Sequence, residues 1–105
     1  MAFADNLKKL PRISHLAAID LLDEAGAVVA SIENKPGSAG SVAVYNQLAQ
    51  TYGAITAEAA RAGLELYAEH VEDARNNPGK HPNIDRLLDI TQAGTTLKVK
   101  HRFAV

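Results

Sequence analysis

The sequence predicts an α+β fold in which about four helices cover a small three-stranded antiparallel sheet. Two stretches, 13–21 and 28–32, alternate apolar and polar residues on either side of an Asp23-to-Gly26 turn, which is typical of a β-hairpin. Residues 97–103 alternate in the same way near the end of the sequence. Because a two-stranded hairpin alone is marginally stable in water, we expect this last strand to join the hairpin. Elsewhere the apolar residues recur at helical spacing.

The first two elements are a short helix and the hairpin. Phe3, Leu7 and Leu10 recur at helical spacing over residues 2–10, and Pro11 stops this helix. In the turn of the hairpin, Gly26 accepts the positive φ that the turn needs. The apolar side of the hairpin is expected to carry Ile13, Ala17, Ile19, Leu21, Val28, Ala30 and Ile32, with His15 in the same row.

Three helices are predicted between the hairpin and the last strand. The first follows the loop at 34–41 and runs to about Tyr52, with Gly53 suited to the left-handed position past its end. Thr56 caps a longer helix that continues to residue 76, where an Asn-Asn-Pro-Gly run ends it. The last helix begins near Pro82 and is broken by Gly94. Their inward faces are expected to hold Val42, Tyr45, Leu48, Ala49, Tyr52, Ala60, Leu64, Tyr67, Val71, Ala74, Ile84, Leu87, Leu88 and Thr91.

The last strand has one apolar and one basic face. Its inward row is Leu97, Val99, His101 and Phe103, and its outward row is Lys98, Lys100 and Arg102. If this strand lies beside the hairpin, the outward row faces Asp20, Ser31 and Glu33, and opposite charges meet across the sheet. We therefore interpret the basic row as structural.

Length and composition indicate one domain spanning residues 1–105. The absence of cysteine excludes disulfides, thiol nucleophiles, thiolate zinc sites and iron–sulfur clusters. With a net charge of −1, no general attraction to nucleic acid or to a membrane surface is expected. Residues 1–5 do not read as a signal peptide, and no apolar run approaches the roughly 20 residues of a membrane span, so a cytoplasmic location is expected. Stacking on nucleic-acid bases is not expected either, because all aromatic residues fall on predicted core faces: Phe3, Tyr45, Tyr52, Tyr67 and Phe103.

The loop before the second helix is the first candidate site. Lys35, Gly37, Ser38, Gly40 and Ser41 follow a strand and open a helix, where free amides and the helix dipole attract anions. The pattern departs from a phosphate-binding P-loop, because Ser41 stands where that motif needs lysine. A second reading of the loop is a cap that turns the chain from sheet to helix. A third is an RNA-clamping loop of the KH type, suggested by the Gly-Ser-Ala-Gly run.

The loop before the fourth helix is the second candidate. Residues 76–86 are rich in ligand-binding side chains, among them Lys80, His81 and Arg86. If the fold brings the two loops together, Lys35, Lys80, His81 and Arg86 can surround one anion. The alternative is a rigid turn before a helix that starts with proline.

A metal site is the third candidate. His70 and Asp73 are three residues apart on a predicted helix and can face one ion, and His81 lies just beyond the helix end. The alternative is that these are surface helix residues. His15 and His101 are expected at the rim of the core. No serine lies in a nucleophile-elbow pattern, so no catalytic residue and no cofactor are predicted, and an enzyme is not favoured.

Three segments resemble a family of small bacterial proteins classed as a domain of unknown function. They are residues 3–10, 31–41 and 77–88, and the resemblance extends over essentially the whole chain. It implies a stand-alone cytosolic protein of bacteria and supplies no activity or ligand. Three hypotheses therefore remain: a non-enzymatic interaction or accessory module that binds a partner protein or a second copy of itself, an anion-binding protein, and a divalent-metal site.

Overall fold

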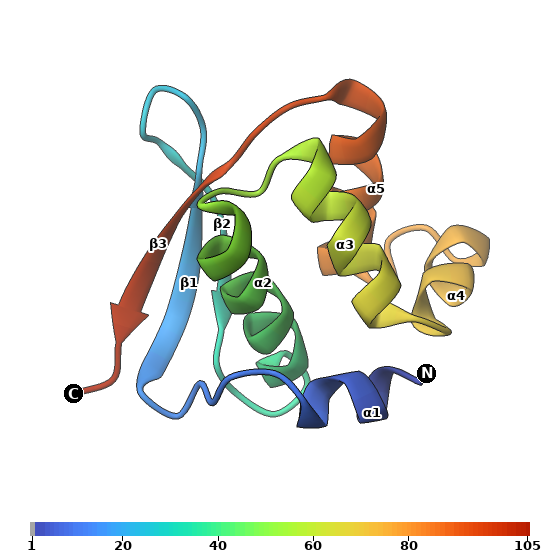
Figure 1. The fold of residues 1–105 in the computed structure, drawn as a ribbon. Helices are drawn as coiled ribbons and strands as arrows, with labels where there is room; N and C mark the ends of the chain where they lie inside the picture. Colours follow the sequence, from blue (N-terminus) through green and yellow to red (C-terminus); the bar gives the residue numbers. More distant parts are fainter. Residues whose placement is uncertain (1) are drawn as a thin grey trace.

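The strands form one small sheet with β1 (Leu16–Leu22) at its centre (Figure 1). A computed structural model describes residues 2–105 of the chain. β1 (Leu16–Leu22) pairs antiparallel with β2 (Val28–Glu33) on one side and with β3 (Lys98–Phe103) on the other. The predicted α+β fold, with a hairpin joined by the last strand, is confirmed. β2 and β3 are both edge strands.

Opposite charges meet across the outer face of the sheet, as predicted. Asp20 of β1 accepts a hydrogen bond from Ser31 Oγ at 2.7 Å. The Nε atom of Arg102 lies 3.0 Å from Asp20 Oδ2 on the other side. Asp20 is buried beneath these partners, so β3 is held to the hairpin by a charge-assisted contact as well as by its backbone.

The apolar row of β1 differs from the predicted alternation. Ile19 and Leu21 are buried as expected, but Ala17 is exposed and Leu16 is buried in its place. The pairing with β3 shifts register between Leu16 and Ala18, and a bulge of this kind reverses which side chains face inward. The start of the strand is therefore one residue out of phase with the prediction.

The same offset exposes aromatic residues that were expected at the core. Phe103 is 66% exposed, and His15 is exposed beside it with ring centroids 6.1 Å apart. The predictions for Phe103 and His15 are wrong, because Phe103 pairs with Leu16 at the end of the sheet and His15 lies just before β1. His101 does lie at the edge of the core, where Nε2 is 3.0 Å from Asn46 Oδ1.

Five helices are present in the described chain, one more than predicted. They are α1 (Phe3–Lys8), α2 (Ala39–Tyr52), α3 (Ala57–Tyr67), α4 (His70–Asn76) and α5 (Pro82–Ala93). Gly53 takes a φ of 79° after α2, and Thr56 Oγ1 accepts a hydrogen bond from Ala59 N at the start of α3, both as predicted. None of the helices over residues 2–105 combines the length and the apolar character needed to cross a membrane.

The predicted long helix over 56–76 is wrong, because the chain breaks at Ala68, where φ is 53°. Contacts from the start of the chain satisfy groups at this break. The side chain of Asn6 donates to Leu66 O at 2.9 Å, and Phe3 N donates to Glu69 Oε1 at 2.8 Å. These partners lie about sixty residues away in the sequence, so local propensity does not reveal the break.

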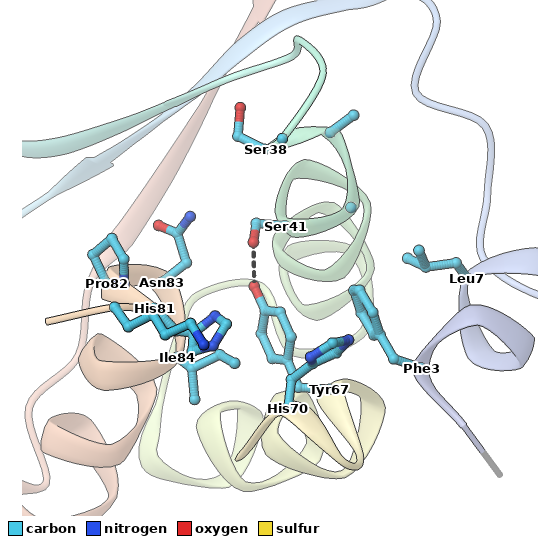
Figure 2. Close-up of a pocket in the computed structure, with 14 residues that line it drawn as sticks. Phe3, Leu7, Ser38, Ser41, Tyr67, His70, His81, Pro82, Asn83 and Ile84 are labelled. Atoms are coloured by element: carbon cyan, nitrogen blue, oxygen red, sulfur yellow. Dashed lines mark hydrogen bonds between the residues drawn. The ribbon is translucent and has the colours of Figure 1, made fainter. Parts of the chain in front are cut away.

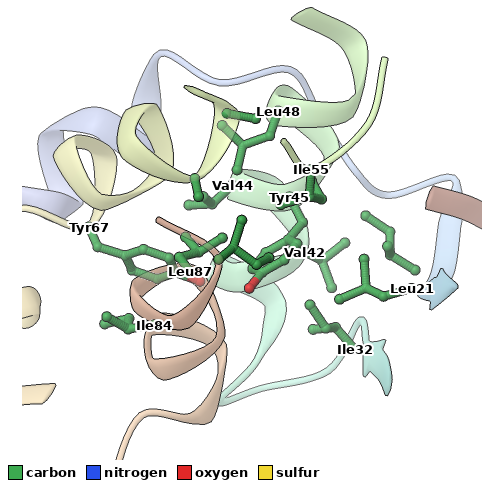
Figure 3. Packing of buried hydrophobic residues seen from close by; sticks show 14 of the residues in the cluster. Leu21, Ile32, Val42, Val44, Tyr45, Leu48, Ile55, Tyr67, Ile84 and Leu87 are labelled. Carbon is green, nitrogen blue, oxygen red and sulfur yellow. The ribbon is translucent and has the colours of Figure 1, made fainter. Parts of the chain in front are cut away.

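The core lies around α2, which is placed between the sheet and α3 (Figure 1). α3 also packs against α5. Figure 3 shows side chains from both hairpin strands and from α2, α3 and α5 meeting in one cluster. Gly63 allows the close approach of α3, since a Cβ there would lie 2.8 Å from a methyl group of Leu48 and of Leu87. The packing brings the first turns of α2 and α5 to the same end of the molecule.

Candidate functional site

The two loops singled out in the sequence line one cavity of about 520 Å³ (Figure 2). Residues 37–41 at the start of α2 form one wall, and residues 80–84 at the start of α5 form another. The remaining walls come from Phe3 and Leu7 of α1, from Tyr67, and from His70. The fold thus places side by side two segments that lie about forty residues apart in the sequence.

The wall from α2 presents unpaired backbone amides. Ser38 does not cap the helix, because its Oγ donates to Glu33 O instead, at 2.5 Å. Ala39 N donates to Lys35 O, and Val42 N donates to Ser38 O. Between them, the amides of Gly40 and Ser41 have no acceptor in the described part of the chain. These are the donors that the first turn of a helix leaves for a ligand or for water.

The wall from α5 holds two basic side chains that contact one carboxylate. Nε2 of His81 lies 2.6 Å from Asp73 Oδ2, and Lys80 Nζ lies 3.0 Å from the same oxygen. The hydrogen bonds from His81 and Lys80 lower the pKa of Asp73 to about 2, so this carboxylate is ionised at neutral pH. Asp73 is not among the residues that line the cavity. It holds Lys80 and His81 in place from behind.

The loop that carries these two side chains is itself tied down. Gly79, with φ of 90°, donates its amide to Asp85 Oδ2 at 2.9 Å. The side chain of Asn77 donates to Asp73 Oδ1 at 3.0 Å. These bonds tie the loop to α4 on one side and to α5 on the other, which restricts the backbone positions of Lys80 and His81.

Aromatic rings form the wall opposite the start of α5. The ring of Phe3 stacks on that of Tyr67, with centroids 5.2 Å apart, and meets His70 edge-on at 5.1 Å. The rings of His70 and His81 are 6.0 Å apart. Gly40 leaves room for Phe3, since a Cβ there would lie 3.2 Å from Phe3 Cζ.

The hydroxyl groups at the base of the cavity are paired. Tyr67 is 3% exposed, and its hydroxyl donates to Ser41 Oγ at 2.6 Å. Burial raises the pKa of Tyr67, so its hydroxyl keeps its proton. Since Ser41 Oγ accepts this bond, its own proton is available to a ligand.

Lys35 and Arg86 are not brought to the cavity. Lys35 Nζ pairs with Glu33 Oε2 at 2.8 Å on the surface. Arg86 donates to Tyr45 OH at 3.1 Å and to Asn83 Oδ1 at 2.9 Å. Tyr45 is fully buried, and burial raises its pKa to about 12. Arg86 thus supports the polar end of a core residue.

The residues predicted as metal ligands are close together but do not form a ligand set. Asp73 and His81 are in contact, whereas His70 packs edge-on to Phe3. Over residues 2–105, no group of three or more His, Asp and Glu side chains is arranged to hold a metal ion. Lys80 also competes for Asp73, because its ammonium bonds the oxygen that a cation would need.

Phe3, Leu7 and Tyr67 are cavity residues that sequence reasoning placed in the core. Their helical spacing is the same for a residue packed against protein and for one that lines a cavity. Asn83 and Ile84 also line the cavity. The sequence pattern predicts Ile84 as a core residue and assigns no role to Asn83.

Comparison with known proteins places the chain in a wider group. The sequence model of a family described as uncharacterised proteins conserved in bacteria (DUF2322) matches residues 3–101. Neither the curated proteins nor the solved structures gave a match.

Proposed function

The chain belongs to this bacterial family, and we propose that it is a binding protein that holds a small anion in the cavity between α2 and α5. The observation that carries the proposal is the chemistry of the walls. They contain one ammonium group, two imidazoles and the amides of a helix start, and no carboxylate among the described residues. Such a lining favours negative charge over a metal cation.

Three kinds of donor are available to the anion. Lys80 carries a positive charge, and its side chain is more than half exposed. The Nδ1 atom of His81 is unpaired in the described chain, because the bond to Asp73 uses Nε2, and it donates to an anion in the doubly protonated form of the ring. Gly40 and Ser41 contribute amides at the positive end of α2, a helix of fourteen residues.

The proposal is tested by titrating inorganic phosphate into the protein and into two lysine variants, with affinity measured by calorimetry. Lys80→Ala removes a cavity cation and is expected to weaken binding by about 2–5-fold, because an exposed ion pair contributes up to about 1 kcal/mol. Lys35→Ala is the matched control, because this lysine is equally exposed and pairs with Glu33 outside the cavity. Equal effects of both variants, or no saturable binding to the wild type, contradict the proposal.

Self-association through β2 is a second candidate function with its own support. β2 is an edge strand, and Val28 and Val29 on it are 55% and 54% exposed. A second copy of the chain can pair antiparallel with this edge about a two-fold axis, as edge strands do when they dimerise. Light scattering across a range of concentrations tests this candidate. A mass of one chain throughout contradicts it, and a dimer that Val29→Lys dissociates supports it.

A cytoplasmic location is part of the proposal. A small anion-binding protein of this composition is expected with the soluble contents of the cell. Fractionation of bacteria that express the tagged full chain measures this directly, and recovery of the protein with membranes or outside the cell contradicts it.

A further inference from the structure

The cavity has walls of two different characters. The starts of α2 and α5 supply amides, Lys80 and His81, whereas Phe3, Leu7 and Tyr67 supply carbon surface. Figure 2 shows Phe3 and Leu7 on the side away from His81, Pro82 and Asn83, with Tyr67 and His70 between the two sides. A ligand that fills the cavity therefore has a polar end and an apolar end.

The size of the cavity argues against an inorganic ion as the natural ligand. A volume of about 520 Å³ lies within the range of sites that hold organic ligands, about 300–1,000 Å³. A phosphate or sulfate ion at the start of α2 would leave the surface of Phe3 and Leu7 uncovered. Covering that apolar surface is a favourable contribution that only a larger ligand can use.

The apolar wall is aromatic. Phe3 is half-buried and already makes one stacked contact with Tyr67 and one edge contact with His70. Rings at these centroid separations, 5.2 and 5.1 Å, form the offset and edge-to-face pairs that aromatic groups prefer. A further ring entering the cavity meets a surface of the same kind.

The geometry points to an anionic group attached to an aromatic ring as the ligand of this cavity. The anionic group lies at the start of α2 with Lys80 and His81, and the ring packs against Phe3. This assignment rests on the proposed anion site and adds the second half of the ligand. It makes Phe3 a specificity-determining residue that acts on the ring and leaves the anionic group unaffected.

Calorimetry with three probes separates the two halves: inorganic phosphate, phenol and phenyl phosphate. Phenyl phosphate is expected to bind about tenfold more tightly than inorganic phosphate, because ring contacts and burial of apolar area add to the same anion contacts. Phenol alone is expected to bind more weakly than either. Equal affinity for the two phosphates refutes the aromatic assignment and leaves the anion site standing. Absence of binding by both refutes the anion site as well, and phenol that binds as tightly as phenyl phosphate refutes the pairing of ring and anion.

Two phenylalanine variants locate the ring. Phe3→Ala is expected to remove most of the advantage of phenyl phosphate and to change the affinity for inorganic phosphate less than twofold. Phe103→Ala is the matched control, because this ring is exposed on β3 and does not line the cavity. If Phe3→Ala disturbs the amide spectrum of the fold, Phe3→Leu keeps apolar bulk at the site and is expected to lose part of the same advantage. An advantage that survives both Phe3 variants, or that Phe103→Ala abolishes, contradicts the assignment.

Discussion

Replacing Tyr67 by Phe removes one hydroxyl from the base of the cavity and leaves the ring in place. The hydroxyl donates to Ser41 Oγ at 2.6 Å, and Tyr67 is 3% exposed. Ser41 is half-buried and lines the cavity, so water can reach its oxygen once the partner is lost. The expected loss is therefore the net value of one hydrogen bond, about 1 kcal/mol in the free energy of unfolding. For a domain of this size it corresponds to a fall in Tm of about 4–8 °C.

The complementary variant is expected to cost more. Ser41→Ala leaves the Tyr67 hydroxyl buried with no acceptor, which costs about 1–3 kcal/mol. In the double variant neither group is left unpaired, so the two losses are expected to overlap by about 1 kcal/mol or more. Urea unfolding of the four proteins measures this overlap. Strictly additive losses, or a Tyr67→Phe variant as stable as the wild type, refute the account of this contact.

Two further variants test the loop behind the cavity and the break between α3 and α4. The hydrogen bonds from His81 and Lys80 lower the pKa of Asp73 from 3.8 to about 2. The ionised carboxylate therefore stabilises the fold above pH 3.8, and this stabilisation is lost as the pH falls through about 2. Urea midpoints of wild type and Asp73→Asn should therefore differ at neutral pH and approach one another as the pH falls from about 4 to about 2. Asp89→Asn, an exposed change on α5, should match the wild type throughout. A difference that stays constant with pH contradicts this reasoning. Ala68→Gly removes the backbone strain of a non-glycine residue at a φ of 53° and is expected to raise the free energy of unfolding by about 1 kcal/mol. A rise in Tm measures this gain, and a lower Tm means that Ala68 is unstrained.

Local chemistry was enough to predict most of the fold. The Asp23 turn, the left-handed Gly53 and the Thr56 cap each depend on residues within a few positions of one another, and all three are confirmed. The contact between Asp20 and Arg102 was also predictable, because alternation places both on the outer face once the strands are neighbours.

The break at Ala68 and the bulge before Ala18 were not predictable in the same way. Asn6 and Phe3 satisfy the break from the far end of the chain, and the bulge depends on the pairing with β3. Both are tertiary effects that override local propensity.

The sequence predicts the two loops that line the cavity but not its aromatic wall. Gly37, Gly40, Ser41, Lys80 and His81 line the cavity as parts of the two loops named from sequence. Lys35 lies outside the cavity, because its ammonium group forms an ion pair with Glu33, two residues earlier in the chain. The aromatic wall escaped detection because helical spacing marks an apolar face without showing whether protein or ligand covers it.

The most direct test of the anion site is a titration of the wild-type protein with phenyl phosphate, followed by the amide and imidazole signals of its NMR spectrum. Saturable shifts are expected at Gly40, Ser41 and His81, with one shared dissociation constant, because these residues face one cavity from two helix starts. An anion site between these helices is contradicted by shifts confined to Lys35 or to the basic row of β3. It is also contradicted if neither the start of α2 nor the start of α5 shows a shift.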